Sequence, residues 1–568
     1  MPYASPVNEF RFLMEQALDF SSVAATERFA EATPETVDAI LTEAARLCDD
    51  ILAPVNRAGD VTPATLENGV VRTSPGFAEA FRAIAEGGWI GLTSDPEHGG
   101  MGLPTTLGTA INDMMSGACL SLQLNPLLTQ GQIEALEAHG SDALKELYLP
   151  KLISGEWSGT MNLTEPQAGS DVGALRSKAE PNGDGTFSVS GQKIYITWGD
   201  ADFVENICHL VLARLPDAAP GTKGISLFLV PKFIPDEAGN PGERNALRVV
   251  SLEHKLGLHG SPTAVMEYDG ATGWMVGAEN GGMAAMFTMM NNARLGVGAQ
   301  GIGVAEAAFQ HALAYAMDRK QGAAPGTGTI IEHADVRRML TQMKADIFAA
   351  RAIALDCAIS IDMGRATGHD DWKARAALLT PIAKAFGSDV GIQVADEGIQ
   401  VHGGMGFVEE TGAAQFARDV RVTAIYEGTN GIQAMDLVAR KMMDGGEAAY
   451  RLLDEIEAEA EEAREALPEL AGAVWSAAEG LRETTEWLVA QDMQARFGGA
   501  TAYLRAFARV LGAHYHLKAA VAESGKGART GLAQFYITRL LPEHDALLAA
   551  VREGADGLFD LSPDDLAA

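Results

Sequence analysis

The spacing of apolar residues changes twice along the chain, and this change limits the fold more than any other feature. Up to about Gly155, apolar residues tend to recur every three or four positions, which is typical of amphipathic helices. Beyond Ser158 the pattern partly alternates, as in Phe187–Thr197, or forms short β-branched runs such as Gly224–Pro231. Helical spacing returns from about Met283. The chain is therefore predicted to be an α+β multidomain protein.

The last part of the chain, from about residue 445, is also predicted to be helical. It opens with the acidic run 453–462, which we interpret as a solvated helix face, and continues with amphipathic helices. The apolar positions of those helices are Trp475, Leu481, Trp487, Leu488 and Leu504. We expect an N-terminal helical extension (1–45), an N-terminal α domain (46–160), a middle β-barrel-like domain (161–283), a C-terminal helical bundle domain (284–444) and an additional C-terminal helical extension (445–568).

Composition argues against several classes of protein. The formal net charge of −33 disfavours nucleic acid and anionic membranes as partners, because both bind basic surfaces. No segment approaches about 18 uninterrupted apolar residues, so no membrane span is expected. The four cysteines lie far apart, which excludes a local CxxC pair or thiolate zinc site and favours buried thiols. We therefore expect a protein of the reducing cytoplasm.

Some motifs point to functions that their context does not support. Gly296–Gly301 matches the GxGxxG pattern, but the preceding Met286–Arg294 has helical spacing, so we predict close helix packing and not a dinucleotide fold. The histidines His254, His259, His333 and His402 are isolated from one another and from other metal ligands, and no metal site is predicted. Neither a GxSxG nor a GxxxxGK[ST] motif occurs, which argues against the commonest hydrolases and nucleotide triphosphatases.

Four segments, in order over about residues 46 to 445, resemble the acyl-CoA dehydrogenase family. They are Met161–Asp171 (MNLTEPQAGSD), Lys193–Gly199 (KIYITWG), Gln400–Phe407 (QVHGGMGF) and Ile425–Gly431 (IYEGTNG). The resemblance implies the family's fold of helical domain, β domain and helical bundle, with FAD as the cofactor. In that family a base removes the α-proton of an acyl-CoA thioester while the β-hydrogen leaves as hydride to flavin N5.

The first two segments resemble the family's contacts with the flavin ring, for which small residues and hydroxyls are suited. Arg319 and the third segment resemble residues that reach the ADP half of the FAD on a neighbouring subunit. The resemblance thus implies a homo-oligomer, with a dimer favoured and a tetramer as the alternative. The cofactor-binding residues that it implies are Met161, Leu163, Thr164, Ser170, Tyr195, Thr197, Arg319, Gln400, Gly403, Gly404, Thr429 and Gly431.

Glu427 is the candidate catalytic base. Thr429 is expected to cap a helix, which leaves Glu427 on the turn just before it. The expected inward stripe of that helix is Ile432, Met435, Val438 and Ala439. The resemblance implies that Glu427 takes the α-proton, and that its backbone N–H and a flavin ribityl hydroxyl stabilise the enolate oxygen. Some family members carry the base just before the arginine that corresponds to Arg294, but Ala293 stands there. The helix N-terminus favours the carboxylate and burial disfavours it, which leaves the pKa open.

The resemblance extends to the substrate and the electron acceptor. The implied substrate contacts are Ser170, Asn291, Arg294 and Gly428. The segments Pro2–Pro6 and Met286–Asn291 and the helices after 445 resemble one branch that acts in dimethylsulfoniopropionate breakdown. That branch implies oxidation of 3-(methylthio)propionyl-CoA to 3-(methylthio)acryloyl-CoA, with electrons passing to an electron-transfer flavoprotein. Short- or medium-chain saturated acyl-CoAs remain alternative substrates, because tertiary packing sets pocket depth. A flavin oxidase and a non-catalytic protein of the same fold are further alternatives.

Overall fold

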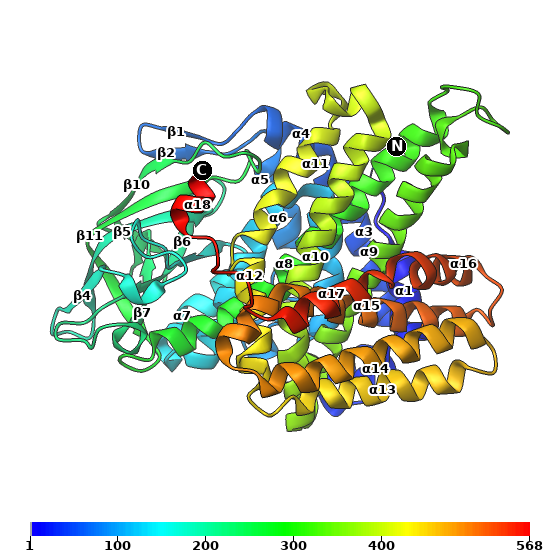
Figure 1. Ribbon diagram of the computed structural model, residues 1–568. Coiled ribbons are helices and arrows are strands. Elements are labelled where there is room, and N and C mark those ends of the chain that lie inside the picture. The colour runs from blue at the N-terminus through cyan, green and yellow to red at the C-terminus, as the bar shows by residue number, and fades with distance from the viewer. Residues whose placement is uncertain (1–2) are drawn as a thin grey trace. The chain divides into compact units, whose positions relative to one another are not determined.

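The structure is a computed structural model that describes residues 3–568 (Figure 1). The contacts group the chain into two compact units, which we describe separately. The first unit contains the chain up to Thr42, Pro104–Gly117 and Arg294–Ala568. The second unit contains Glu43–Leu103 and Ala118–Ala293. Three helices run across these boundaries: α3 (Pro34–Arg46), α6 (Thr105–His139) and α8 (Gly282–Asp318).

The first unit is helical, which confirms the helical pattern predicted for the second half of the chain (Figure 1). Its early helices are α1 (Val7–Phe12) and α2 (Phe20–Ala24), and its long central pair is α9 (Ala334–Thr367) and α10 (Asp370–His402). They are followed by α11 (Ala413–Val420), α12 (Asn430–Val438), α13 (Glu447–Ala463), α14 (Pro468–Ala490), α15 (Met493–Ala522), α16 (Ala528–Phe535), α17 (Glu543–Glu553) and α18 (Pro563–Ala567). Leu481, Leu488 and Leu504 are buried, as their helical spacing predicts.

Helices α8 and α10 approach each other through glycines. A Cβ atom at Gly301 would lie 2.4 Å from the carbonyl oxygen of Gly387, and one at Gly298 would lie 2.7 Å from that of Ala383. Any side chain at these positions would force the helices apart. The GxGxxG match is therefore part of a helix–helix contact, which confirms the prediction of close helix packing.

The acidic run of α13 is only partly solvated, in contrast to our interpretation of it. Arg375 Nη2 lies 3.1 Å from Glu455 Oε1, and Lys518 Nζ lies 2.9 Å from Glu459 Oε2. Together with the buried ring of His514, these two carboxylates place possible metal-ligating atoms within 4.8 Å of one another. Both carboxylates already have a cationic partner, so the cluster carries no metal assignment. Glu455 and Glu459 are half-buried because α10 and α15 supply their basic partners, whereas the other end of the run is exposed.

The second unit holds the main β-sheet and confirms the predicted β character of the middle of the chain. The sheet order is β3-β6-β7-β11-β5-β4, with β10 paired to β11. The bounds of these strands are β3 (Trp157–Asn162), β4 (Lys178–Pro181), β5 (Phe187–Thr197), β6 (Asn206–Ala213), β7 (Ser226–Pro231), β10 (Leu247–Leu252) and β11 (Thr263–Val276). A separate hairpin is formed by β8 (Phe233–Pro235) and β9 (Pro241–Arg244), and helices α4 (Ala53–Val61), α5 (Phe77–Glu86) and α7 (Asp142–Ile153) complete the unit.

One part of the segment predicted to be helical is a β-hairpin. Strands β1 (Thr65–Glu67) and β2 (Val70–Arg72) are antiparallel, and the turn between them is Asn68-Gly69, with φ of 52° and 78°. Asn-Gly is the sequence most suited to such a turn, because both positions need positive φ. Val71 is fully buried against the core of the large sheet. The helical prediction was wrong here because the strands are too short to show a period.

Strand β11 is 14 residues long and pairs irregularly with its neighbour β5. Its pairing with β5 shifts register between Ala264 and Met266 and again between Asp269 and Ala271. Each shift moves later side chains to the opposite face, which breaks the alternation that marks a strand in sequence.

The structure also bears on the cysteines and on membrane segments. All four cysteines have buried side chains, as expected. Among residues 3–568, no helix has both the length and the apolar composition that a membrane crossing requires.

Candidate functional site

Glu427 lies on a strained turn that leads into α12. Its backbone φ is 57°, in the left-handed region that side chains other than glycine rarely adopt. Gly428 follows with φ 83°, and a Cβ atom there would lie 2.9 Å from Gln433 Nε2. The same Nε2 donates to the carbonyl oxygens of Glu427 and Gly428, at 3.1 Å each. The buried Gln433 side chain therefore fixes the orientation of both carbonyl groups of the turn.

The helix that follows begins as the sequence predicts. Thr429 is its N-cap, and its hydroxyl oxygen accepts a hydrogen bond of 3.3 Å from the backbone N–H of Ile432. The predicted inward stripe was wrong in part, because Met435 is 42% exposed and Ile432 is only half-buried. The buried face of α12 instead consists of Gln433, Ala434, Asp436, Leu437 and Val438. Gln433 faces inward because it binds the carbonyls of the turn, and Asp436 because it pairs with Arg294 of α8.

Two cations lie near the half-buried carboxylate of Glu427. Burial raises the pKa of Glu427 to about 7, and the positive charges of Arg294 and Lys384 oppose that rise. Arg294 comes from α8, is 5% exposed and lies 3.5 Å from Asp436 through Nη1 and Oδ2. Lys384 comes from α10 and is fully buried. Glu427 can thus change protonation near neutral pH, which suits a general base.

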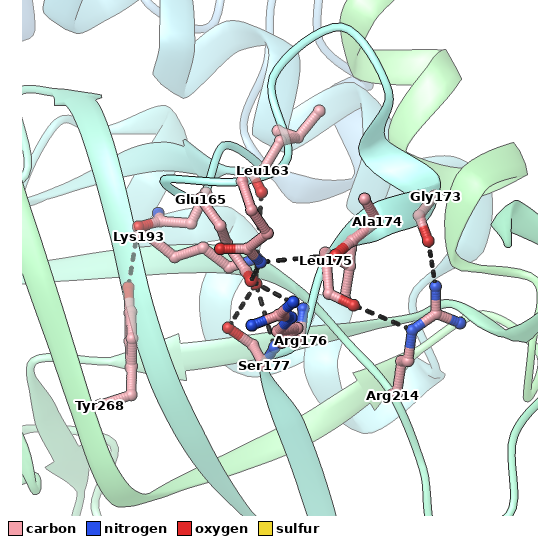
Figure 2. A network of polar contacts seen from close by, with 12 residues as sticks. Leu163, Glu165, Gly173, Ala174, Leu175, Arg176, Ser177, Lys193, Arg214 and Tyr268 are labelled. Carbon is pink, nitrogen blue, oxygen red and sulfur yellow. Dashed lines mark hydrogen bonds and ion pairs between the residues drawn. The ribbon is translucent and has the colours of Figure 1, made fainter. Parts of the chain in front are cut away.

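In the second unit, the loop after β3 is organised around the buried carboxylate of Glu165 (Figure 2). Lys193 Nζ lies 2.8 Å from Glu165 Oε1, and the backbone N–H groups of Arg176 and Ser177 donate to Glu165 at 2.7 and 3.0 Å. The Ser177 hydroxyl donates at 2.6 Å. Burial opposes ionisation of Glu165, but the Lys193 ammonium and these donors lower its pKa to about 2. The carboxylate is therefore a fixed anion that closes the base of the loop.

The same cluster ties the loop to β5. Lys193 Nζ also donates to the carbonyl oxygen of Leu163 at 3.0 Å, and the backbone N–H of Ile194 donates to that of Thr164 at 2.9 Å. Farther along the loop, Arg214 donates to the carbonyl oxygens of Gly173 and Leu175 (Figure 2). The loop thus has a defined path beside the end of β5, although it contains little regular secondary structure.

The predicted flavin contacts of this unit lie along that path. Met161, Leu163, Thr164 and Thr197 are half-buried, and Ser170 is exposed. Tyr195 is 61% exposed and has a φ of 60°, which turns a large aromatic side chain outward at the end of a strand. A planar, partly apolar ring system with hydrogen-bonding edges fits beside this aromatic and hydroxyl surface. The residues present therefore fit a flavin.

The other candidate residues lie in the first unit or at its boundary. Four of them are exposed at the C-terminal ends of two helices. Arg319 follows α8, Gln400 lies in the last turn of α10, and Gly403 and Gly404 follow α10. A Cβ atom at Gly403 or Gly404 would have no neighbour within 4 Å, so the backbone there is open to a ligand. Asn291 is exposed, whereas Arg294 is buried. Thr429 and Gly431 are exposed at the start of α12.

The predicted isolation of the histidines was wrong for His254 and His259, whose rings stack with centroids 6.4 Å apart. The ring of His402 lies 4.6 Å from that of His311, a histidine that the sequence prediction did not consider. Ring stacking buries their apolar faces and needs no metal ion.

Sequence reasoning did not single out Lys384, Gln433 or the Glu165–Lys193 pair. Lys384 interrupts the apolar run Ile382–Phe386, and a lone charge in such a run is the signal that could have found it. Glu165 and Lys193 both lie in segments that carry the resemblance, but their pairing depends on how the loop folds back on β5.

The chain matches four domain families along most of its length. Residues 34–156, 160–271 and 280–443 match the N-terminal, middle and C-terminal domains of acyl-CoA dehydrogenase. Residues 452–562 match a domain described as acetyl-CoA dehydrogenase C-terminal like.

Individual proteins are similar over comparable spans. A 3-methylmercaptopropionyl-CoA dehydrogenase of Ruegeria pomeroyi is 48% identical over 467 residues, which covers 81% of this chain and 79% of that protein. A butyryl-CoA dehydrogenase of Syntrophomonas wolfei is 37% identical over 477 residues, covering 80% of this chain and 78% of that one. Caenorhabditis elegans ACDH-11, solved in complex with C11-CoA, has the same fold, with a TM-score of 0.79, 20% identity and coverage of 97% and 96%.

Proposed function

The chain belongs to the acyl-CoA dehydrogenase family of FAD-dependent oxidoreductases, and on that premise we propose that it oxidises 3-(methylthio)propionyl-CoA to 3-(methylthio)acryloyl-CoA. The proposal of this substrate is supported by the 48% identity to the Ruegeria pomeroyi enzyme over most of both chains. A short-chain saturated substrate is the second candidate, and the 37% identity to a butyryl-CoA dehydrogenase favours it.

The observation that carries the proposed chemistry is the environment of Glu427. The pKa of about 7 lets this carboxylate accept a proton at neutral pH, and the positive charges of Arg294 and Lys384 favour its ionised form. We assign to Glu427 the removal of the α-proton of the thioester. The backbone N–H of Glu427 is assigned to the developing enolate oxygen, because Gln433 and the positive φ fix the orientation of that peptide.

FAD, when bound, supplies the acceptor for the β-hydrogen, which leaves as hydride. We propose that Met161, Leu163, Thr164, Ser170, Tyr195 and Thr197 hold the flavin, with Thr429 and Gly431 at the start of α12. Arg319, Gln400, Gly403 and Gly404 are assigned to the ADP half. Ser170, Asn291, Arg294 and Gly428 are assigned to the substrate, with Arg294 acting from its buried position through charge.

Several finer features belong to the same proposal. We place the enzyme in the cytoplasm, with an electron-transfer flavoprotein as its electron acceptor. A homodimer is favoured, because the exposed Gly403 and Gly404 backbone and the 88% exposed Phe407 offer a surface for a second copy. We also propose that the five segments predicted from the sequence are the domains of the protein. Most of the proposed flavin contacts then belong to segment 161–283, and the proposed base Glu427 to segment 284–444.

Anaerobic bleaching of the bound flavin tests both the base and the substrate. The panel is 3-(methylthio)propionyl-CoA, butyryl-CoA and a medium-chain acyl-CoA, mixed with wild type, Glu427→Gln and Glu462→Gln. We expect the methylthio substrate to bleach wild type fastest and Glu427→Gln to be slower by at least about 100-fold, the range of general-base catalysis. Glu462 is exposed on α13, so its variant is the matched control and should behave as wild type. Bleaching of Glu427→Gln at the wild-type rate would refute the assignment of the base.

A further inference from the structure

Lys384 is a fully buried lysine whose ammonium group contacts the turn that carries Glu427. Its Nζ donates to the carbonyl oxygen of Gly428 at 3.0 Å and to Asn430 Oδ1 at 2.9 Å. Gly428 follows the base, and Asn430 is the first residue of α12. A single side chain of α10 therefore holds the turn and the helix start together.

Asn430 extends this contact into α10. Its Nδ2 donates to Asp389 Oδ1 at 2.6 Å and to Ser388 Oγ at 3.0 Å. Asn430, which accepts a hydrogen bond from Lys384, is thus itself held by residues of α10. The Lys384 ammonium cannot shift without breaking several of these hydrogen bonds. Such a network fixes a charge in place more firmly than a surface ion pair does.

Burying an ammonium group costs free energy unless opposite charges and hydrogen bonds offset the loss of water. Burial lowers the pKa of Lys384 to about 8, and the carboxylates of Glu427 and Asp389 oppose that fall. Lys384 is thus mainly protonated at neutral pH. A neutral donor such as glutamine could satisfy the Gly428 carbonyl, so hydrogen bonding alone does not account for a lysine at this position.

We propose that Lys384 is a positioning residue for the reaction, which holds the turn carrying Glu427 in place and, through its positive charge, favours the ionised form of that carboxylate. This inference rests on the proposed role of Glu427 as the base. Gln433 also donates to the Gly428 carbonyl oxygen, and to that of Glu427, but carries no charge. Variants of Gln433 therefore separate the clamping of the turn from the effect of the positive charge.

Other charged groups around Glu427 must be considered for its pH dependence. From α8 comes Arg294, from α10 come Lys384 and Asp389, from the turn itself Tyr426, and from α12 and the residues after it Asp436, Arg440 and Lys441. Asp436 already engages Arg294, Arg440 and Lys441. Replacing Arg294 would also remove an ion-pair partner of Asp436, whereas the charge of Lys384 can be removed without breaking an ion pair of Asp436.

The test is the pH profile of anaerobic flavin reduction by acyl-CoA in the holoenzyme. Lys384→Gln keeps a donor but removes the charge, and Gln433→Met removes a donor but no charge. We expect the acid limb of Lys384→Gln to move to higher pH by about one unit, because a nearby opposite charge lowers a carboxyl pKa by that order. Gln433→Met should reduce the plateau rate and leave the limb in place. Lys384→Met provides a second uncharged variant if Lys384→Gln does not fold.

A second readout does not depend on turnover. Difference infrared titration follows the protonated carboxyl band that disappears in Glu427→Gln, and its midpoint should rise by the same unit in Lys384→Gln. An unshifted limb and midpoint in both uncharged Lys384 variants would overturn the inference, as would an equal shift in Gln433→Met. If Glu427→Gln itself bleached at the wild-type rate, the proposed base would fail, whatever the behaviour of the Lys384 variants.

Discussion

Lys193 Nζ lies 2.8 Å from Glu165 Oε1 in the second unit, with 0% and 4% of the two side chains exposed. Residues on both sides of Glu165 carry the proposed flavin contacts, so this pair fixes the loop before any cofactor binds. Taking two charges out of water costs several kcal/mol per ion, and the surrounding donors offset that cost only while both partners are present.

Loss of one partner of this pair should destabilise the protein strongly. We expect Lys193→Met to weaken stability by about 3 kcal/mol or more, because the Glu165 charge would stay buried without its cation. The double variant Lys193→Met with Glu165→Met should recover much of that loss. Thermal melting of the FAD-free protein checks stability, and fluorescence titration with FAD checks the loop. Melting of Lys193→Met at the wild-type temperature would contradict the role of the pair.

Glu165 also predicts a loss of stability in acid. Its pKa falls from an ordinary 4.5 to about 2 in the folded protein, so its contribution is present above pH 4.5 and is lost as the pH falls toward 2. The lost contribution is about 3 kcal/mol. Melting temperatures measured between pH 6 and pH 3 should fall less steeply in Glu165→Gln than in wild type. Parallel curves for the two proteins would show that carboxylates other than Glu165 cause the loss of stability in acid.

Glu427 predicts the pH dependence of substrate oxidation. A base must be deprotonated to act, and its pKa is about 7. The rate of flavin reduction should therefore fall about tenfold for each pH unit below 7 and level off above it. Stopped-flow bleaching with saturating acyl-CoA measures this limb. A rate that is independent of pH between 5 and 8 would contradict the assignment.

The glycine contact between α8 and α10 predicts a further effect on stability. Gly301→Ala would place a Cβ atom 2.4 Å from the Gly387 carbonyl oxygen and should destabilise the protein by about 1 to 3 kcal/mol. Gly472, within α14, has no atom within 4 Å of a built Cβ and is the control. Gly472→Ala should be neutral or stabilising by up to about 1 kcal/mol, because alanine favours a helix. Equal melting of the two variants would show that the helices can separate without cost.

Local features of the fold were predictable where neighbours along the chain decide them. Thr429 caps α12 because its hydroxyl reaches the N–H three residues later, and that contact depends on local geometry alone. Strand β5 has the bounds of the alternating run that predicted it. The hairpin at Asn68-Gly69 also had a local signal, which the dominant helical spacing around it concealed.

The inward face of α12 could not be predicted from periodicity. Hydrophobic spacing favoured Ile432 and Met435, yet the structure buries Gln433 and Asp436. These polar residues face inward because the Glu427 turn and the guanidinium of Arg294 supply their partners. Such partners come from segments that the helix's own sequence does not contain.

The sequence by itself determined the order of helical and β segments, the family and the residue at the head of α12 that can act as a base. These properties reside in composition, spacing and short motifs. The tertiary structure decided the electrostatic setting of that base, because Arg294 and Lys384 reach Glu427 from two other helices and burial raises its pKa. It also joined Glu165 to Lys193 across 28 positions of the chain. Charge interactions act through space, and only the folded chain defines the distances over which they act.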